Sequence, residues 1–260
     1  MIAQRVTLES LTPEPMRPVV RRLWRRLIGR PLDGWDLTGG RVAAGPFRGM
    51  RYATFGLGSV ICAKMLGTYE RELHPWLDEI IATPYRMIHV IGCAEGYYAV
   101  GLARAMPAST VLAYDLDPRV PSVLAGIAAR NGVVDRVRFS GEFTAASLAV
   151  PATGAELIVC DVEGEELSLL DPTATPRLLD CDLLVEIHDG QTETDEHIIA
   201  SRFATTHAIR RVVAKLRTCD DLPPRLRGQL PTDVAEKMMN EGRSRGLTWL
   251  FMRRHELPCE

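Results

Sequence analysis

The sequence predicts an α/β fold in which helices cover both faces of a mostly parallel sheet. Short apolar runs alternate with segments of helical periodicity from about Gly67 onward, and several of these runs end at a glycine or an acidic residue. The 260 residues are 46% hydrophobic and 25% charged, which is ordinary globular composition. Such alternation is typical of parallel sheets with crossover helices, where ligands bind beyond the carboxyl ends of the strands. The residues that follow each strand are therefore the candidates for function.

Seven strands and four helices follow from the periodicity. We expect strands at 86–91, 110–114, 137–139, 157–160 and 183–187, and two late strands at 208–214 and 247–252. Helical periodicity covers 97–105, 120–130, 195–203 and 234–240.

The chain is expected to divide into an N-terminal extension, residues 1–66, and a ligand-binding domain, residues 67–260. Residues 14–29 predict a helix with an apolar stripe and an arginine-rich face, and short strand-like pieces such as 50–53 follow it. The stripe favours packing on the main domain or on a homodimer partner. A basic amphipathic helix can also lie on a membrane surface or contact a phosphorylated ligand. A lid over a small-molecule acceptor is a further role open to this extension.

Composition excludes several classes of partner. A formal net charge of -2 provides no strong field for nucleic acid. No apolar run reaches the roughly 18–20 residues of a membrane span, and the N-terminus lacks a signal pattern. The six cysteines form no CxxC pair, and Cys160 and Cys181 lie in apolar runs typical of buried reduced thiols. We therefore expect a cytoplasmic protein without nucleic-acid partners or stable membrane insertion.

The loop after the first strand is the first candidate site. Its glycines, Gly92 and Gly96, allow a sharp turn and close approach of a ligand, and they enclose Cys93, Ala94 and Glu95. The helix that follows offers its N-terminus to an anion. The GxxxG spacing differs from the GxGxxG of dinucleotide sites. Alone, the pattern also fits a tight turn with no ligand.

The next two strand ends suggest a nucleoside. Asp115 lies 23 positions after Gly92 and can accept hydrogen bonds from both ribose hydroxyls, with Leu116 beside it. The alternative for Asp115 is a solvated loop acid, whereas Asp117 is expected to cap the next turn. After the third strand, Glu142 and Phe143 are expected near the adenine, although capping would explain Glu142 equally well.

The fourth and fifth strands end in a dense group of ionisable residues, which are Asp161, Glu163, Glu186, His188 and Asp189. A carboxylate or an imidazole there can remove a proton from an attacking hydroxyl. Asp161, His188 and Asp189 could instead hold a divalent ion such as Mg²⁺, although no ligand spacing enforces one. Strand alternation puts Glu186 and His188 on one face, so Glu186 could also be a structural carboxylate that pairs with an arginine.

Two further residues favour structural roles. His89 lies inside the first strand and is expected to be a core histidine with satisfied hydrogen bonds. Glu241, before the last strand, could contribute to an acceptor pocket, but an ion pair is the favoured interpretation.

These motifs together resemble the FkbM-type family of class I S-adenosylmethionine-dependent methyltransferases. The resemblance rests on the 92–98 loop, on Asp115, on Asp161-Val-Glu-Gly-Glu165 and on Val185-Glu-Ile-His188, and it covers roughly residues 67–253. Gly67-Thr-Tyr-Glu70 is similar to a segment that often lines the cofactor, so the resemblance adds Glu70 to the candidate contacts. The resemblance implies that the 92–96 backbone holds the methionine part of the cofactor. The family usually has an acid two positions before the first glycine, which often helps to organise that methionine end, and this chain has Val90 there.

The resemblance implies a Rossmann-like fold with seven strands, the last of them antiparallel, and methyl transfer to a hydroxyl of a sugar or natural product. The cofactor contacts would come from Glu70, the 92–96 loop, Asp115, Leu116, Glu142, Phe143 and Asp161. His188 is the first choice for the base, and Asp161 the second. Two alternatives remain open, a noncatalytic nucleoside-binding scaffold and an NAD(P)-dependent oxidoreductase.

Overall fold

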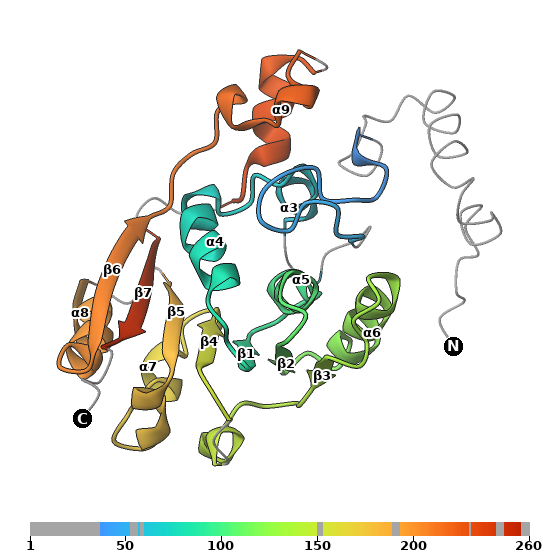
Figure 1. Cartoon of the computed structure of the whole chain (residues 1–260). Helices are drawn as coiled ribbons and strands as arrows, with labels where there is room; N and C mark the ends of the chain where they lie inside the picture. Colours follow the sequence, from blue (N-terminus) through green and yellow to red (C-terminus); the bar gives the residue numbers. More distant parts are fainter. Residues whose placement is uncertain are drawn as a thin grey trace, which may run out of the picture.

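A seven-stranded sheet forms the centre of the computed structural model, which describes residues 37–52, 57, 60–149, 153–188, 193–228, 230–242 and 247–255. The helix expected at 14–29 and the candidate ligand Asp189 lie outside these residues. The strands are β1 (Met87–Ile91), β2 (Thr110–Tyr114), β3 (Val137–Phe139), β4 (Glu156–Cys160), β5 (Asp182–Ile187), β6 (His207–Val213) and β7 (Thr248–Arg254). They lie in the order β3-β2-β1-β4-β5-β7-β6, with β7 in the gap between β5 and β6 (Figure 1).

Strand directions match the expected fold. The pairs β3–β2, β2–β1, β1–β4 and β4–β5 are parallel, whereas β7 runs antiparallel to both β5 and β6. The chain therefore has the Rossmann-like class I methyltransferase fold, and the predicted fold class is confirmed. The parallel register brings the carboxyl ends of β1, β2, β4 and β5 to one edge of the sheet.

Helices cover both faces of the sheet, as predicted. On one face lie α4 (His74–Ala82), α5 (Tyr97–Ala105) and α6 (Val120–Arg130), and on the other lie α7 (Glu166–Leu169) and α8 (Glu193–Phe203) (Figure 1). Successive residues of one strand serve opposite faces. Val159 belongs to the core under α4, α5 and α6, whereas Ile158 and Cys160 belong to the core that includes α8.

The segment before β1 and the segment between β6 and β7 pack together. Helix α3 (Ile61–Leu66) contacts α9 (Thr232–Met239) in a small core that includes Leu66 and Met239. Short 3₁₀ helices complete the chain: η2 (Arg71–Leu73), η3 (Ala145–Leu148), η4 (Pro176–Asp180), η5 (Cys219–Asp221) and η6 (Pro224–Leu226). Helices α3 and α4 were not expected from the sequence periodicity.

The described part of the N-terminal extension shares the main core. Phe47 lies edge-on against Tyr97 and Tyr98 of α5, with ring centroids 5.2 and 6.0 Å apart. Tyr52 is fully buried, and its ring meets Tyr97 at 5.5 Å. Residues on both sides of the expected boundary at 66 and 67 therefore belong to one packed unit.

The cysteines and the helices of the described residues bear on two expectations drawn from the sequence. Cys160 and Cys181 are buried free thiols, as predicted. None of the helices in the described ranges has the length and apolarity that crossing a membrane requires.

Candidate functional site

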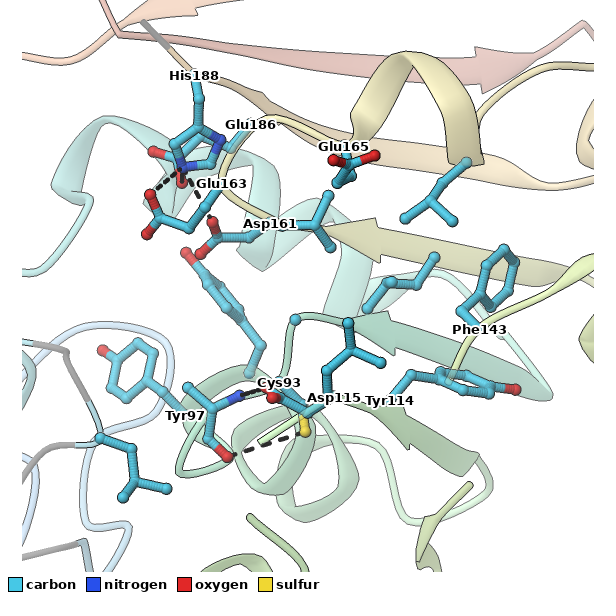
Figure 2. Close-up of a pocket in the computed structure, with 18 of the residues that line it drawn as sticks. Cys93, Tyr97, Tyr114, Asp115, Phe143, Asp161, Glu163, Glu165, Glu186 and His188 are labelled. Atoms are coloured by element: carbon cyan, nitrogen blue, oxygen red, sulfur yellow. Dashed lines mark hydrogen bonds and ion pairs between the residues drawn. The ribbon is translucent and has the colours of Figure 1, made fainter. Parts of the chain in front are cut away.

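A cavity of about 940 Å³ opens at the carboxyl ends of β1, β2, β4 and β5. Figure 2 shows His188, Glu186, Glu163 and Asp161 gathered on one side of it, with Cys93 and Asp115 on the other. Ligand pockets span about 300–1,000 Å³, so this volume is large enough for a nucleoside cofactor beside a small acceptor. The predicted site residues on the cavity wall are Gly92, Cys93, Ala94, Asp115, Leu116, Glu142, Phe143, Asp161 and His188.

Both glycines of the first loop are required by their protein neighbours. Gly92 has φ +76°, and a Cβ there would lie 1.7 Å from the carbonyl oxygen of Asp161. Gly96 has φ +94°, and a Cβ would lie 2.4 Å from Leu124 Cδ1. The first glycine lets the β1 loop lie directly against the end of β4, and the second lets α5 begin close to α6.

The loop backbone is tied to the end of β2. Gly92 N and Cys93 N both donate to Tyr114 O over 3.0 Å, and Ala94 N donates to Asp115 Oδ2 over 2.9 Å. Asp115 Oδ1 accepts from Asp117 N over 2.9 Å. These bonds fix the Asp115 carboxylate at the cavity wall, and a carboxylate has further lone pairs that a ribose can use.

An apolar and aromatic surface continues from Asp115. Leu116 is 78% exposed although it is apolar, and Phe143 packs edge-on against Tyr114 with centroids 5.2 Å apart. Both line the cavity, as does the exposed carboxylate of Glu142. This wall suits a flat, partly apolar group such as a purine base.

His188 is surrounded by carboxylates from three segments. Its Nδ1 lies 2.7 Å from Glu166 Oε1. Its Nε2 lies 3.4 Å from Asp161 Oδ1 and 3.5 Å from both Glu163 Oε2 and Glu186 Oε2 (Figure 2). The structure therefore brings together four of the five ionisable residues expected at this edge, and it adds Glu166.

The charges at His188 favour a proton on the ring. Burial works against the imidazolium, but the hydrogen bond to Glu166 and the charge of Asp161 raise the pKa of His188 above its ordinary value. Burial likewise works against the Glu166 carboxylate, yet the bond to His188 lowers the pKa of Glu166. An ionised Glu166 can only accept a hydrogen bond, so Nδ1 is the donor and Nε2 is the atom that gains or loses a proton at the cavity.

The same group has a spacing that a divalent ion could use. One ligand atom each from Asp161, Glu186 and His188 lie within 4.8 Å of one another. The set expected from the sequence contained Asp189, which lies outside the described residues. Glu186 is therefore a candidate metal ligand with Asp161 and His188. The sequence suggested for it a structural role as the partner of an arginine.

Three predicted cofactor contacts do not line the cavity. Glu70 and Glu95 are fully buried, and Gly96 lies behind the loop at the start of α5. Glu95 accepts from the hydroxyl of Tyr52 over 3.3 Å and from the backbone N–H of Leu57. These residues contact other parts of the protein and support the cavity wall from behind.

The cavity wall also includes residues that were not named as cofactor contacts. Lys64 lies outside the sequence motifs, Tyr69 and Tyr97 belong to the 67–70 and 92–98 segments, and Glu241 was a candidate for the acceptor pocket. Glu241 accepts from Arg217 Nε over 2.8 Å, so the expected ion pair is present at the cavity wall. Lys64 and Tyr69 lie upstream of β1, where the sequence has no periodic signal. Tyr69 belongs to the 67–70 segment of the resemblance, whereas Lys64 is brought to the site by the packing of α3 beside the glycine loop.

The structural roles expected for two other residues are confirmed. His89 is buried, with Nδ1 3.1 Å from the Tyr114 hydroxyl and Nε2 3.3 Å from Glu156 Oε2. Asp117 accepts from Arg119 N over 2.8 Å and caps the turn before α6.

Solved structures similar to this chain include methyltransferases. Neither a protein-family model nor a curated protein sequence matches the chain. A precorrin-6y C5,15-methyltransferase from Geobacter metallireducens is 11% identical over 68% of this chain and 88% of its own, with a TM-score of 0.47. An O-methyltransferase of tomaymycin synthesis from Streptomyces achromogenes, in complex with SAM, is 15% identical over 67% and 76%, with a TM-score of 0.44.

An O-methyltransferase from Bacillus cereus, in complex with SAH, is 11% identical over 67% of this chain and 77% of its own, with a TM-score of 0.44. At these identities and TM-scores, the similarities add nothing to the fold that the strand order itself defines.

Proposed function

We propose that this protein is an S-adenosylmethionine-dependent O-methyltransferase of the FkbM type, acting on a hydroxyl group of a small molecule such as a sugar or a natural product. The observation that carries the proposal is the single cavity shared by two sets of groups. Asp115 and the glycine loop line one side of it, and the proton acceptor His188 lines the other.

The charges of the cavity suit a cationic cofactor. Of the residues that the structure describes, seven acidic ones line it, namely Asp115, Glu142, Asp161, Glu163, Glu165, Glu186 and Glu241, against one lysine. S-adenosylmethionine carries a sulfonium and an ammonium group, whereas NAD(P) carries phosphates that these carboxylates would repel. The acidic lining therefore favours the methyl donor over the dinucleotide.

The residues present fit this cofactor at the ribose and adenine ends. Asp115 would accept hydrogen bonds from the ribose, and Leu116 and Phe143 would contact the base. The bound cofactor would supply an electrophilic methyl group and leave as S-adenosylhomocysteine. The protein then has to align an acceptor hydroxyl and remove its proton, and alignment alone reaches effective molarities of about 10⁵–10⁸ M in favourable systems.

His188 Nε2 is the proton acceptor in this proposal, and Glu166 keeps the ring oriented by holding Nδ1–H. Asp161 and Glu186, both within 3.5 Å of Nε2, stabilise the imidazolium that forms. The acceptor's O–H bond breaks as its oxygen forms the new O–CH₃ bond.

Two measurements test the proposal. Calorimetry with S-adenosylhomocysteine and with NADP⁺ should show binding of the first alone, and the reverse result would indicate an oxidoreductase. Incubation with methyl-labelled cofactor and panels of sugars and phenols should yield a labelled ether. Cofactor binding without transfer to any small-molecule fraction would favour the noncatalytic scaffold. Full turnover in excess EDTA is expected, and its loss would assign the Asp161–Glu186–His188 group to a metal.

A further inference from the structure

The lysine of α3 is the one lysine or arginine on the described wall of the cavity. Lys64 is 6% exposed at its side chain and lies over the rings of Tyr69 and Tyr97, with Nζ 4.7 and 5.6 Å from their centroids. A buried ammonium has three donors and is costly to leave without hydrogen bonds. The hydrogen-bond acceptors that the protein provides around Lys64 Nζ therefore indicate whether this group is available to a ligand.

The protein offers this ammonium little compensation. Its ion-pair partner, Glu95 Oε2, is 3.7 Å away, beyond hydrogen-bond length, and Glu95 already accepts from Tyr52 and Leu57. Within the described ranges, Lys64 Nζ donates no hydrogen bond. The two tyrosine faces stabilise a cation but accept no conventional hydrogen bond. An anionic ligand in the cavity would supply the hydrogen-bond acceptors for Lys64 Nζ.

The glycine loop itself has little left to offer an anion. The N–H groups of Gly92, Cys93, Ala94 and Gly96 all donate within the protein, to Tyr114, Asp115 and Cys93. The remaining wall is rich in carboxylates, which repel an anion. Lys64 is therefore the basic side chain on the described wall that could bind a negatively charged part of the cofactor.

Lys64 also lies at the end of the site where the cofactor's amino acid is expected. Glu95 belongs to the loop that begins at Gly92, and Tyr97 follows it directly. The same loop holds Asp115, the proposed ribose contact, through the Ala94 N–H. A chain running from the ribose along the loop, away from the adenine wall, would reach Lys64.

We propose that Lys64 binds the α-carboxylate of the cofactor's methionine moiety. The inference rests on the proposed function, since it assigns a residue to one end of the same site. It also accounts for Val90 in place of the usual acid. The amino-acid end of the cofactor would be held through its carboxylate by Lys64 of α3, a helix outside the loop.

The test is calorimetry on the full chain with two ligands, S-adenosylhomocysteine and its decarboxylated analogue, which lacks only the carboxylate. Wild type should bind S-adenosylhomocysteine about tenfold to a hundredfold more tightly than the analogue. In Lys64→Met that preference should vanish, with affinity for the analogue unchanged. Lys64→Arg should keep part of it. Lys237→Met, at an exposed lysine of α9, should behave as wild type.

Each other outcome is decisive. Equal binding of the two ligands by wild type overturns the role of Lys64 and leaves the proposed function standing, whereas binding of neither ligand overturns both. A Lys64→Met variant that loses affinity for both ligands equally shows a structural role only. Should that variant fail to fold, Lys64→Gln combined with Glu95→Gln removes both buried charges together, and the same loss of preference is expected.

Discussion

His188 Nδ1 and Glu166 Oε1 lie 2.7 Å apart, and this bond sets the chemistry of the other ring nitrogen. Because Glu166 is almost fully buried and accepts the hydrogen bond from Nδ1–H, Nε2 is the ring nitrogen left for the cavity. A histidine held by a carboxylate on one side and facing a substrate pocket on the other is arranged as a base.

Replacing His188 by alanine tests that role. Turnover should fall by about 10²–10⁴-fold, because a positioned base contributes that much. Affinity for S-adenosylhomocysteine should stay within about twofold of wild type, because Asp115 and the glycine loop, the main cofactor contacts, lie on the opposite wall. His197→Ala, at an exposed histidine of α8, is the matched control. Equal turnover in the His188 variant and wild type would remove His188 from the mechanism.

The pH dependence follows from the raised pKa of His188. Only the neutral ring accepts a proton, so kcat/KM should rise with pH through an apparent pKa above the ordinary 6.5. Glu166→Gln removes the acceptor charge that raises this pKa, while burial still lowers it. The rising limb should therefore move to lower pH in that variant. A limb that stays in place would show that another group titrates.

Stability has the opposite pH dependence. A group whose pKa is higher in the folded chain stabilises the fold fully below its unfolded pKa, and this contribution is lost as pH rises through the folded value. For His188 the loss is expected above pH 6.5, and urea titrations of wild type and His188→Asn should converge there. Curves that stay parallel across that range would contradict the raised pKa.

Substitution of Asp115 tests the cofactor site, and substitution of the neighbouring Asp117 is its control. Asp115→Asn should weaken S-adenosylhomocysteine binding by about tenfold or more, since a hydrogen bond to a charged group is worth about 1.5–3 kcal/mol. Asp117→Asn should leave affinity unchanged, because its carboxylate faces Arg119. Isothermal calorimetry measures both. Equal losses in the two variants would mean that Asp115 acts through the fold of its loop.

Alanine substitutions at Gly92 and Gly132 distinguish the cost of a steric collision from the cost of a left-handed backbone. Both have positive φ, but a Cβ on Gly132 meets nothing within 4 Å. Gly132→Ala should therefore cost only the left-handed conformation, about 1–2 kcal/mol of unfolding free energy. Gly92→Ala adds a collision with the carbonyl of Asp161 and should cost more than about 4 kcal/mol. Similar losses in urea denaturation would show that the β1 and β4 ends can move apart.

The sequence by itself determined the sheet and most of one wall of the site. Strand periodicity and the residues after each strand are local features, and parallel register then brings the strand ends together whatever the loops do. The positions of Asp115, Asp161 and His188 at one edge of the sheet therefore follow from the strand pattern alone. The buried role of His89 follows from the same pattern.

Only the tertiary structure decided which side chains face the cavity and what each one contacts. Glu95 has the loop position of a ligand contact, yet it is directed at Tyr52, Leu57 and Lys64, because α3 packs beneath the loop. Glu166 became the partner of His188 because a residue with positive φ, Glu163, turns the chain back after β4. Lys64 lies outside the sequence motifs, and its place at the glycine loop results from packing between segments far apart in sequence, which local patterns do not encode.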